Sequence, residues 1–407
     1  MAVSVSVAFN DSNSLIQQSN MQSATQSNVQ SNVQSTMQSN MQYDTIIIGA
    51  GLAGCSAAIQ LASSGVRVLL LEQSRYPVHK LCGEFLSVEV METFDRLGIL
   101  ESVQKAGASS IGQAYLTTQS GQSFHHVLPG TALGLSRYKL DLILFERSSA
   151  LGADCRDGVV VKSVSGSLAD GFEVTTTQGT FTARMVLGAY GKKSALGTTV
   201  GLPKRSPFVA FKAHYTGLDI SNMIELHAFT GGYCGLSAIE AGQVNLCWIG
   251  HDRILQGDRA LPPALYTNPV LADRLSKMTR VQSSLNGLSQ ISLDIKPKFV
   301  QDICQIGDTA GMITPLCGDG MAMALRSAEL AVPFALGFLK GELSEVQFKR
   351  GYESAWNREF WLRLRVGKLM HQAFIQPSLA DIGVGLCDRL PKLGAWIIQS
   401  TRGRAIA

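Results

Sequence analysis

A strand, a glycine-rich turn, a helix and a second strand are predicted within residues 43–74, which have the sequence "YDTIIIGAGLAGCSAAIQLASSGVRVLLLEQS". The turn follows three isoleucines, and Gly49, Gly51 and Gly54 match the pattern G-x-G-x-x-G. Glu72 closes the second apolar run, 23 residues after the first glycine. A glycine motif between strand and helix, followed at this distance by an acid, is the full context typical of dinucleotide binding.

The glycines have a physical reason in that context. They allow a tight turn and let a pyrophosphate come close to the first N–H groups of the helix, where the dipole favours an anion. A carboxylate at Glu72 would accept hydrogen bonds from the adenosine ribose. The sequence therefore predicts an α/β fold with a Rossmann-like unit near its start.

Composition narrows the class of protein. The chain has 407 residues, of which 45% are hydrophobic and 16% charged, as in globular proteins. The net charge of +4 without a long basic run predicts no nucleic-acid partner. Residues 330–339, the longest apolar stretch of the C-terminal half, are too few to span a bilayer. The start lacks the basic segment of a signal peptide, and none of the eight cysteines forms C-x-x-C. We therefore expect a reduced, cytoplasmic protein with no metal site.

Residues 1–42 are predicted to be a disordered tail. Glutamine recurs every fourth residue from position 22 to position 42, in polar, low-complexity sequence. Valines and methionines at the same spacing leave a weak transient helix as the alternative. Met41 is an alternative translation start, because the first strand begins two residues later.

A second glycine cluster, residues 306–325, has the sequence "IGDTAGMITPLCGDGMAMAL". Asp308 follows a predicted strand and precedes a loop and a helix. Between the two clusters the chain shows hairpin patterns rather than continued strand–helix alternation. This order suits a split FAD site better than an NAD site: the first cluster holds the pyrophosphate, and Asp308 the ribityl hydroxyls. The "CGDGMA" turn would direct a helix N-terminus at the flavin ring.

These motifs, with "RYPVHKLCGEFLS" at 75–87, resemble the FAD-dependent aromatic hydroxylases and geranylgeranyl reductases, over about residues 43–345. Gly311, where hydroxylases usually have a histidine, and the "K-x-C-G-E" segment favour the reductase side. The resemblance implies an FAD-binding domain of discontinuous segments (43–105, 137–200 and 296–345). It also implies an inserted β-sheet substrate domain (106–136 and 201–295) and C-terminal helices (346–407).

The resemblance also implies a set of site residues. The catalytic candidate is Cys82, a thiol beside the isoalloxazine that gates the substrate or donates a proton; the alternative is a small residue that merely fits a tight turn. Candidate walls of the substrate pocket are Tyr233, His227 and Trp248. No triad is predicted, since neither His214 nor His227 has an evident acid partner. The residues expected to bind FAD are Gly49, Gly51, Ala53, Gly54, Glu72, Gly83, Arg137, Val161, Asp308, Pro315, Gly318, Gly320 and Met321.

Departures from the family pattern affect the electron donor and the substrate. Tyr190, in "AYGKKS" at 189–194, stands where hydroxylases carry an aspartate that serves NADPH. The donor is therefore NAD(P)H or a reduced ferredoxin-like protein, with slow reduction by NAD(P)H expected. The segment from Tyr233 lacks the Trp, Phe and Pro of lipid reductases, which leaves a prenyl substrate open. The W-x-W-x-I-P segment of halogenases is absent, and no pocket lysine is identified.

The predicted function is transfer of hydride or electrons between flavin and an apolar, unsaturated or aromatic small molecule. A monooxygenase or halogenase that uses O2 is the first alternative. A flavin-binding protein without turnover is the second, and a pocket sealed by large side chains would favour it.

Helix patterns dominate after residue 346. Phe348, Tyr352, Trp356, Phe360 and Leu364 form an apolar stripe at i, i+4 spacing. Such a stripe predicts packing against the domain core. Basic residues nearby leave a peripheral membrane contact, and hence a membrane-peripheral location, as the minority interpretation.

Overall fold

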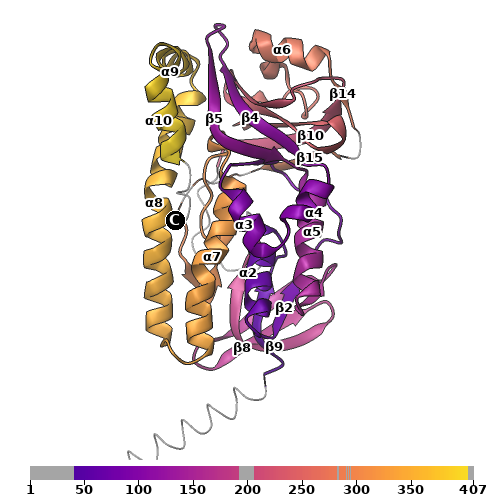
Figure 1. The fold of residues 1–407 in the computed structure, drawn as a ribbon, viewed down its shortest axis with the longest axis vertical. Coiled ribbons are helices and arrows are strands. Elements are labelled where there is room, and N and C mark those ends of the chain that lie inside the picture. Colours follow the sequence, from indigo (N-terminus) through magenta and orange to yellow (C-terminus); the bar gives the residue numbers. More distant parts are fainter. Residues whose placement is uncertain are drawn as a thin grey trace, which may run out of the picture.

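The chain folds around two β-sheets that lie at opposite ends of the long axis of the molecule, and its last helices run along one side (Figure 1). The computed structural model describes residues 41–191, 206–281, 284–289, 291, 293 and 295–401. The predicted tail, except for its last two residues, and the two lysines of "AYGKKS" lie outside the described residues.

The lower sheet in Figure 1 has five parallel strands in the order β17-β9-β1-β2-β6. The short strand β16 and the hairpin β7–β8 extend it with antiparallel pairing. The central strands are buried runs of isoleucine, valine and leucine, as expected for a parallel sheet covered on both faces. The bounds are β1 (Tyr43–Ile48), β2 (Val68–Leu71), β6 (Asp154–Arg156), β7 (Val161–Ser167), β8 (Gly171–Thr176), β9 (Gly179–Gly188), β16 (Phe299–Val300) and β17 (Ile303–Gln305).

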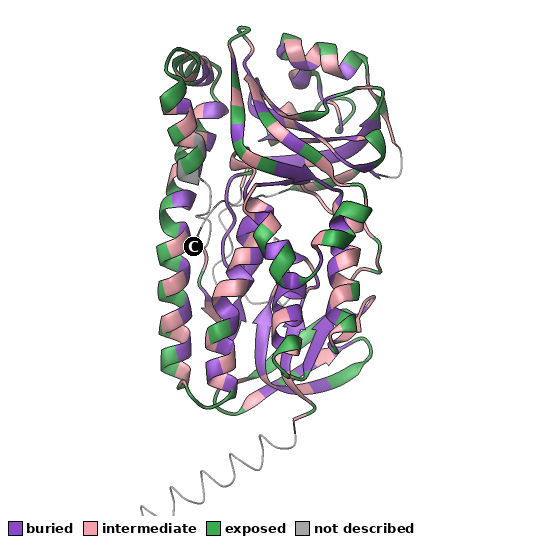
Figure 2. Cartoon of the chain, in the orientation of Figure 1, coloured by how far each residue is buried: buried purple, intermediate pink, exposed green. Residues whose placement is uncertain are grey.

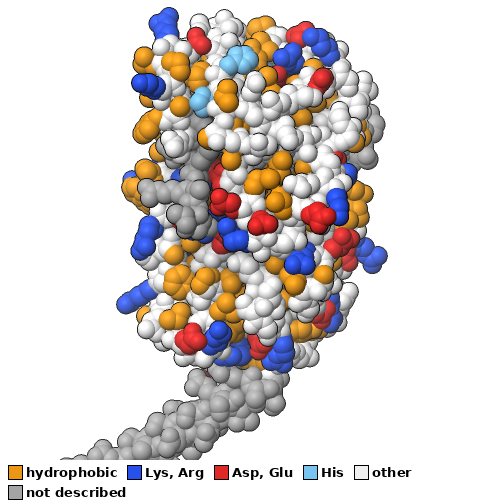
Figure 3. Space-filling model, viewed as in Figure 1, with side chains coloured by type: hydrophobic (Ala, Val, Ile, Leu, Met, Phe, Trp, Pro, Cys, Tyr) orange, Lys and Arg blue, Asp and Glu red, His pale blue; other side chains and the backbone are white. Residues whose placement is uncertain are grey.

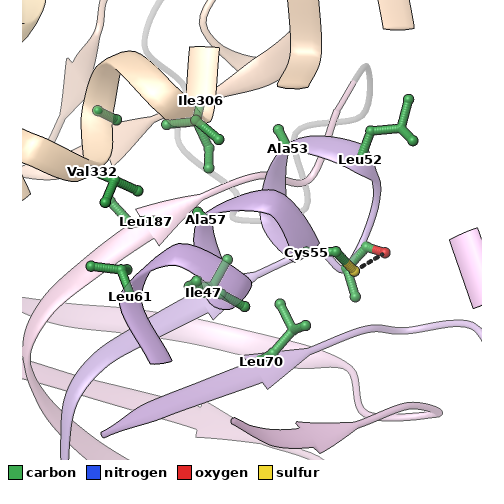
Figure 4. Close-up of a cluster of buried hydrophobic side chains, with 14 of the residues drawn as sticks. Ile47, Leu52, Ala53, Cys55, Ala57, Leu61, Leu70, Leu187, Ile306 and Val332 are labelled. Atoms are coloured by element: carbon green, nitrogen blue, oxygen red, sulfur yellow. Dashed lines mark hydrogen bonds between the residues drawn. The ribbon is translucent and has the colours of Figure 1, made fainter. Parts of the chain in front are cut away.

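Helix α2 packs closely on this sheet because its side chains are small. Ala57 and Leu61 lie beside Ile47 of β1 in the core (Figure 4). A Cβ atom at Gly54 would lie 1.9 Å from the backbone oxygen of Gly49, so the third glycine of the motif is required for this approach. The helices of this half are α2 (Leu52–Ser63), α3 (Val90–Leu97), α4 (Leu100–Lys105), α5 (Arg137–Ala150) and α7 (Gly320–Leu339).

The upper sheet has the order β14-β10-β13-β12-β11-β4-β5-β3, and β15 also pairs with β10. Its pairs are antiparallel except for β11 with β4. The bounds are β3 (Phe85–Leu86), β4 (Ser109–Thr117), β5 (Ser123–Gly134), β10 (Phe208–Thr216), β11 (Asn222–Phe229), β12 (Gly232–Ala238), β13 (Val244–His251), β14 (Thr279–Arg280) and β15 (Asn286–Ser289), with helix α6 (Pro269–Ser276) near the edge.

The C-terminal helices are α8 (Glu345–Phe374), α9 (Pro377–Arg389) and α10 (Pro391–Thr401). The stripe from Phe348 to Leu364 is buried against the core, which confirms that it packs on the domain. The opposite side of α8 is mostly exposed (Figure 2).

Helix α7 is the one helix in the described part of the chain that is long and apolar enough to cross a bilayer. The uninterrupted apolar stretch at residues 330–339 covers only the second half of this helix, which begins at Gly320. Within the fold α7 packs against α2 and α8, and 56% of its most apolar window is buried. That packing suits the core helix of a globular domain.

Candidate active site

A cavity of about 920 Å³ lies between the two sheets and extends beneath α8, α9 and α10. This is near the upper end of the range for ligand pockets in proteins. The carboxyl ends of β1 and β2 and the first turns of α2 and α7 contribute to its lining. Ligands of open α/β sheets bind at these strand ends.

The first turn of α2 forms one end of the cavity. Its N-cap, Gly51, makes no side-chain capping bond, so the first N–H groups of the helix remain available to a ligand. Glu72 is held beside this turn: its Oε2 accepts from the backbone N of Ala50 at 3.1 Å, and its Oε1 from that of Ser74 at 3.0 Å. A fixed carboxylate thus stands next to an anion-binding helix end.

The second glycine cluster contacts the same helix. Gly307 has a φ of +63°, and a Cβ atom there would lie 2.8 Å from the Cβ of Ala53. Glycine therefore lets the turn η5 (Gly307–Thr309) rest on α2. Asp308 lines the cavity from this turn, and none of the described residues donates a hydrogen bond to its carboxylate. Its oxygens are available to the hydroxyl groups of a ligand.

Farther along the cavity, the turn η6 (Pro315–Cys317) leads into the N-terminus of α7. Gly318 turns the chain with a φ of +69°, and a Cβ atom at Gly320 would meet nothing within 4 Å. The start of α7 is therefore open to a ligand. Behind it, Asp319 is buried and paired with Arg363 of α8; burial raises the pKa of Asp319 to about 7, against the opposing effect of Arg363.

Residues 78–84, here called the strap, line the cavity where the two sheets meet. Two asparagine side chains of the upper sheet fix the strap. Asn245 Nδ2 donates to the backbone oxygen of Cys82 at 3.1 Å, and Asn286 Nδ2 donates to that of His79 at 3.0 Å. The side chain of Cys82 lines the cavity and is partly exposed; its Sγ accepts from the backbone N of Glu84 at 3.4 Å.

A buried charge cluster anchors the end of the strap. Glu84 has a φ of +55°; one carboxylate oxygen is paired with the Lys212 ammonium, and the other lies 2.6 Å from His214 Nε2. The backbone N of Arg137 also donates to this carboxylate, at 2.8 Å. Burial alone would raise the pKa of Glu84, but Lys212 and His214 outweigh it and hold the pKa below its ordinary value.

This cluster corrects one sequence interpretation: His214 does have an acid partner, Glu84, 130 positions earlier in the chain. Lys212 and His214 are two positions apart in β10, so their side chains lie on the same face of a strand that is otherwise mostly apolar. Two basic residues two apart in a buried strand are the signal that would have indicated a buried acid.

Most of the predicted site residues come together around the cavity. Those that line it are Gly49, Gly51, Ala53, Glu72, Cys82, Gly83, Arg137, Val161, Tyr233, Trp248, Asp308, Pro315, Gly318, Gly320 and Met321. The structure places Gly54 and His227 outside the lining, Gly54 because it serves the packing of α2.

His227 differs from the prediction for a reason of strand geometry. Ile224 and Leu226 line the cavity, so Glu225 and His227, which alternate with them on β11, point to the other face. There His227 is fully buried between Thr117 Oγ1, at 2.7 Å, and Glu225 Oε2, at 3.0 Å. The acid partner of His227, which the sequence did not reveal, is therefore Glu225, two positions earlier on the same face of β11.

Tyr233 is held rigidly at the cavity wall, whereas Trp248 borders the cavity but packs its ring behind the sheet, against Phe211 and Phe229. The Tyr233 hydroxyl accepts from the backbone N of Leu316 at 3.0 Å and lies 3.1 Å from Thr314 Oγ1. Trp248 donates its indole N–H to the oxygen of Ala260 at 2.8 Å. Tyr233 therefore contributes shape to the pocket. The predicted role of the Trp248 side chain as a pocket wall is wrong, because Cys247 and Ile249 on either side of it face the cavity and strand alternation turns Trp248 to the other face.

The lining fits FAD. Two open helix starts, a fixed carboxylate at Glu72 and one at Asp308 that accepts no hydrogen bond from the described residues correspond to the charged and hydroxyl-bearing parts of a flavin dinucleotide. The family model for the FAD-binding domain matches residues 42–232. The chain contains an FAD-binding domain.

The FAD-binding chain is related to enzymes of more than one activity. Digeranylgeranylglycerophospholipid reductase 2 of Methanopyrus kandleri is 26% identical over 338 residues, which cover 78% of this chain and 83% of the relative. A 1H-pyrrole-2-carbonyl-[peptidyl-carrier protein] chlorinase of Pseudomonas fluorescens is 22% identical, over 71% of this chain and 74% of the relative. At the level of class, the chain is an FAD-dependent oxidoreductase.

Solved structures share the fold. The myxobacterial chondrochloren halogenase superposes with a TM-score of 0.73 at 20% identity, over 89% of this chain and 90% of the halogenase. This likeness confirms the predicted architecture of an FAD-binding Rossmann-like domain, a second sheet and C-terminal helices.

Proposed function

We propose that the chain is an FAD-dependent reductase that saturates carbon–carbon double bonds of an apolar, isoprenoid-like lipid. The observation that carries the proposal is the course of the cavity. Beyond the strap it continues as an apolar chamber between the upper sheet and the C-terminal helices. Its walls include Leu116, Phe124, Leu226, Ile249, Met312, Phe374 and Val384. The lipid reductase among the relatives supports the same substrate class.

In this proposal the two halves of the cavity have separate tasks. When bound, FAD would supply a two-electron centre that can give or take a hydride. Gly51 and the start of α2 would hold the pyrophosphate, Asp308 the ribityl hydroxyls, and the start of α7 the polar edge of the flavin ring. The apolar chamber would exclude water and orient the double bond.

Saturating a double bond requires a hydride at one carbon and a proton at the other. We assign the proton to the Sγ–H of Cys82, which lies in the strap where the polar and apolar parts of the cavity meet. The backbone N–H of Glu84, 3.4 Å from this sulfur, would stabilise the thiolate left behind. Solvent would then return a proton to the thiolate.

Two observations weigh against a halogenase and against a flavin protein without turnover. Lys80 is the one lysine among the described residues that line the cavity, and its Nζ is bound to Glu72 and Asp141 at the cofactor end, at 3.2 and 3.3 Å. It is therefore poorly placed to serve a halogenase at the substrate. The open chamber is also unlike the sealed pocket that a non-catalytic flavin protein would have.

Isotope labelling tests the proposal. FAD-saturated protein, reduced beforehand, is mixed with detergent-dispersed geranylgeraniol under argon or under 18O2, and the products are analysed by mass spectrometry. We expect products heavier by the mass of one or more pairs of hydrogen atoms under argon, without 18O in either case. A product that forms only under 18O2 and carries the label would overturn the proposal in favour of a monooxygenase.

A further inference from the structure

The outer side of α8, α9 and α10 carries an unusual number of exposed apolar side chains. Of the 15 large hydrophobic residues that are exposed in the described chain, nine lie between residues 346 and 396. The most exposed of them are Leu369 at 68%, Ile382 at 66% and Trp396 at 62%. Soluble proteins rarely leave such a patch uncovered without a binding role. We call it the apolar face: Trp361, Leu362, Leu369, Leu379, Ile382, Leu386, Leu390 and Trp396.

The apolar face follows helix geometry. Leu379, Ile382, Leu386 and Leu390 are spaced by three, four and four residues, so they lie on one side of α9 and continue just past its end. Ala380 and Val384 of the same helix are buried and line the cavity. Helix α9 is therefore apolar on two sides, of which one covers the chamber and the other faces outward. The outward leucines and isoleucine of α9 are exposed, unlike the stripe from Phe348 to Leu364 on α8, which packs on the core.

Positive charge accompanies the apolar face. Five basic residues are exposed here: on α8 they are Arg358, Arg365 and Lys368, and near the junction of α9 and α10 they are Arg389 and Lys392. Among the described residues from 357 to 401, Asp388 is the one exposed acid. The Arg365 guanidinium lies 4.0 Å from the centre of the Trp361 ring. Orange and blue side chains occur together along this side of the molecule (Figure 3).

The apolar face also meets the cavity. Leu379 is 45% exposed and lines the cavity, and the exposed Gly383 lines it one turn farther along α9. The chamber therefore reaches the surface along α9, next to the outward apolar side chains.

We propose that the apolar face docks on an anionic lipid bilayer and that an apolar substrate enters the chamber from the bilayer beneath α9. The entry step rests on the proposed reductase function, but the docking does not. Tryptophan and leucine beside arginine and lysine suit the boundary between acyl chains and anionic headgroups. Five exposed basic residues against one exposed acid favour an anionic bilayer over a second copy of the chain, which would bring the same positive charge to the contact.

Vesicle flotation tests the docking. FAD-saturated protein is mixed with vesicles of phosphatidylcholine alone or with 30 mol% phosphatidylglycerol, a composition on the order of anionic natural membranes. We expect binding to the anionic vesicles that weakens at higher salt, as for any screened attraction. The triple variant Ile382→Ser/Leu386→Ser/Trp396→Ser should bind at least ~10-fold more weakly, because each change removes a buried apolar contact with the bilayer.

A matched control is available outside the C-terminal helices, on β5 and on the 3-10 turn η3 (Pro263–Thr267). Val127→Ser/Tyr266→Ser removes two side chains that are 73% and 49% exposed but do not belong to the apolar face, and it should bind vesicles like the wild type. Both variants should retain FAD content and turnover of detergent-dispersed substrate. A wild type that does not float with either vesicle would overturn the docking, whatever the reductase test shows. A dimer in light scattering that the triple variant dissociates would also overturn it and assign the face to a second copy.

Discussion

Replacing Lys212 with methionine should destabilise the protein strongly, because it removes one half of a buried ion pair. Lys212 and Glu84 are both fully buried, and the lysine Nζ also lies 3.0 Å from His214 Nε2. In Lys212→Met the Glu84 carboxylate would keep His214 and the backbone N of Arg137 as partners but lose its cation. Breaking a buried pair in this way costs about 3–5 kcal/mol, and the remaining partners place the expected loss near the lower end, at about 3 kcal/mol.

Urea unfolding of the FAD-saturated protein, followed by circular dichroism, measures this loss. The control is Lys105→Met, which breaks an ion pair with Glu101 on the exposed surface of α4. Exposed pairs contribute little, so the control should unfold at the same urea concentration as the wild type. The double variant Lys212→Met/Glu84→Gln removes both charges and should recover most of the stability lost in the single variant. A single variant as stable as the control, or a double variant less stable than the single, would refute the buried pair.

The pH dependence has a defined sign. The pKa of Glu84 is held below its ordinary value, so the carboxylate contributes stability above the unfolded-state pKa of about 4.3. That contribution is lost as the pH falls through the lower folded-state pKa. The stability difference between the wild type and Lys212→Met should therefore be full at neutral pH and shrink in acid. A difference that is constant down to strongly acidic pH would contradict an ionised Glu84.

Three further predictions concern the cofactor and the chemistry. Asp308→Ala should weaken FAD binding by about 1.5–3 kcal/mol, because the ribityl hydroxyls lose a charged acceptor; flavin fluorescence titration checks this, and an unchanged dissociation constant would count against the split site. Cys82→Ser should keep its FAD but form product ~10²-fold more slowly, as for a lost proton donor; turnover at the wild-type rate would reduce Cys82 to a steric role. NADPH and NADH should reduce the flavin far more slowly than dithionite in stopped-flow mixing, because the Tyr190 ring occupies the expected aspartate position and its hydroxyl donates to Gln305 Oε1 at 2.7 Å; reduction within about a second would contradict this.

The cofactor half of the site could be predicted because its signals are local. Gly49, Gly51 and Glu72 belong to one strand–turn–helix–strand unit whose spacing is fixed by the chain itself. Asp308 is distant in sequence, but its glycine-rich turn marks it independently. The structure adds the reason for Gly307, which is contact with the Cβ of Ala53.

The strap and its anchors could not be predicted in the same way. Glu84 meets Lys212 and His214 only because the strap lies against the upper sheet, and no local pattern encodes that encounter. The position of His227, by contrast, was available from strand alternation: Ile224 and Leu226 mark the cavity face, and Glu225 and His227 the other. The outward face of α9 could not be predicted because apolar residues at three- and four-residue spacing look the same in sequence whether they pack on the core, as on α8, or face outward, as on α9.

An anaerobic single-turnover experiment tests the proposed reductase most directly. FAD-saturated protein is reduced with one equivalent of dithionite per flavin and mixed, without oxygen, with detergent-dispersed geranylgeraniol, while the flavin absorbance near 450 nm is followed. The reductase proposal predicts that the absorbance of oxidised flavin returns and that one double bond is saturated for each flavin reoxidised. Flavin that stays reduced until oxygen is admitted, with the lipid unchanged under anaerobic conditions, would contradict it.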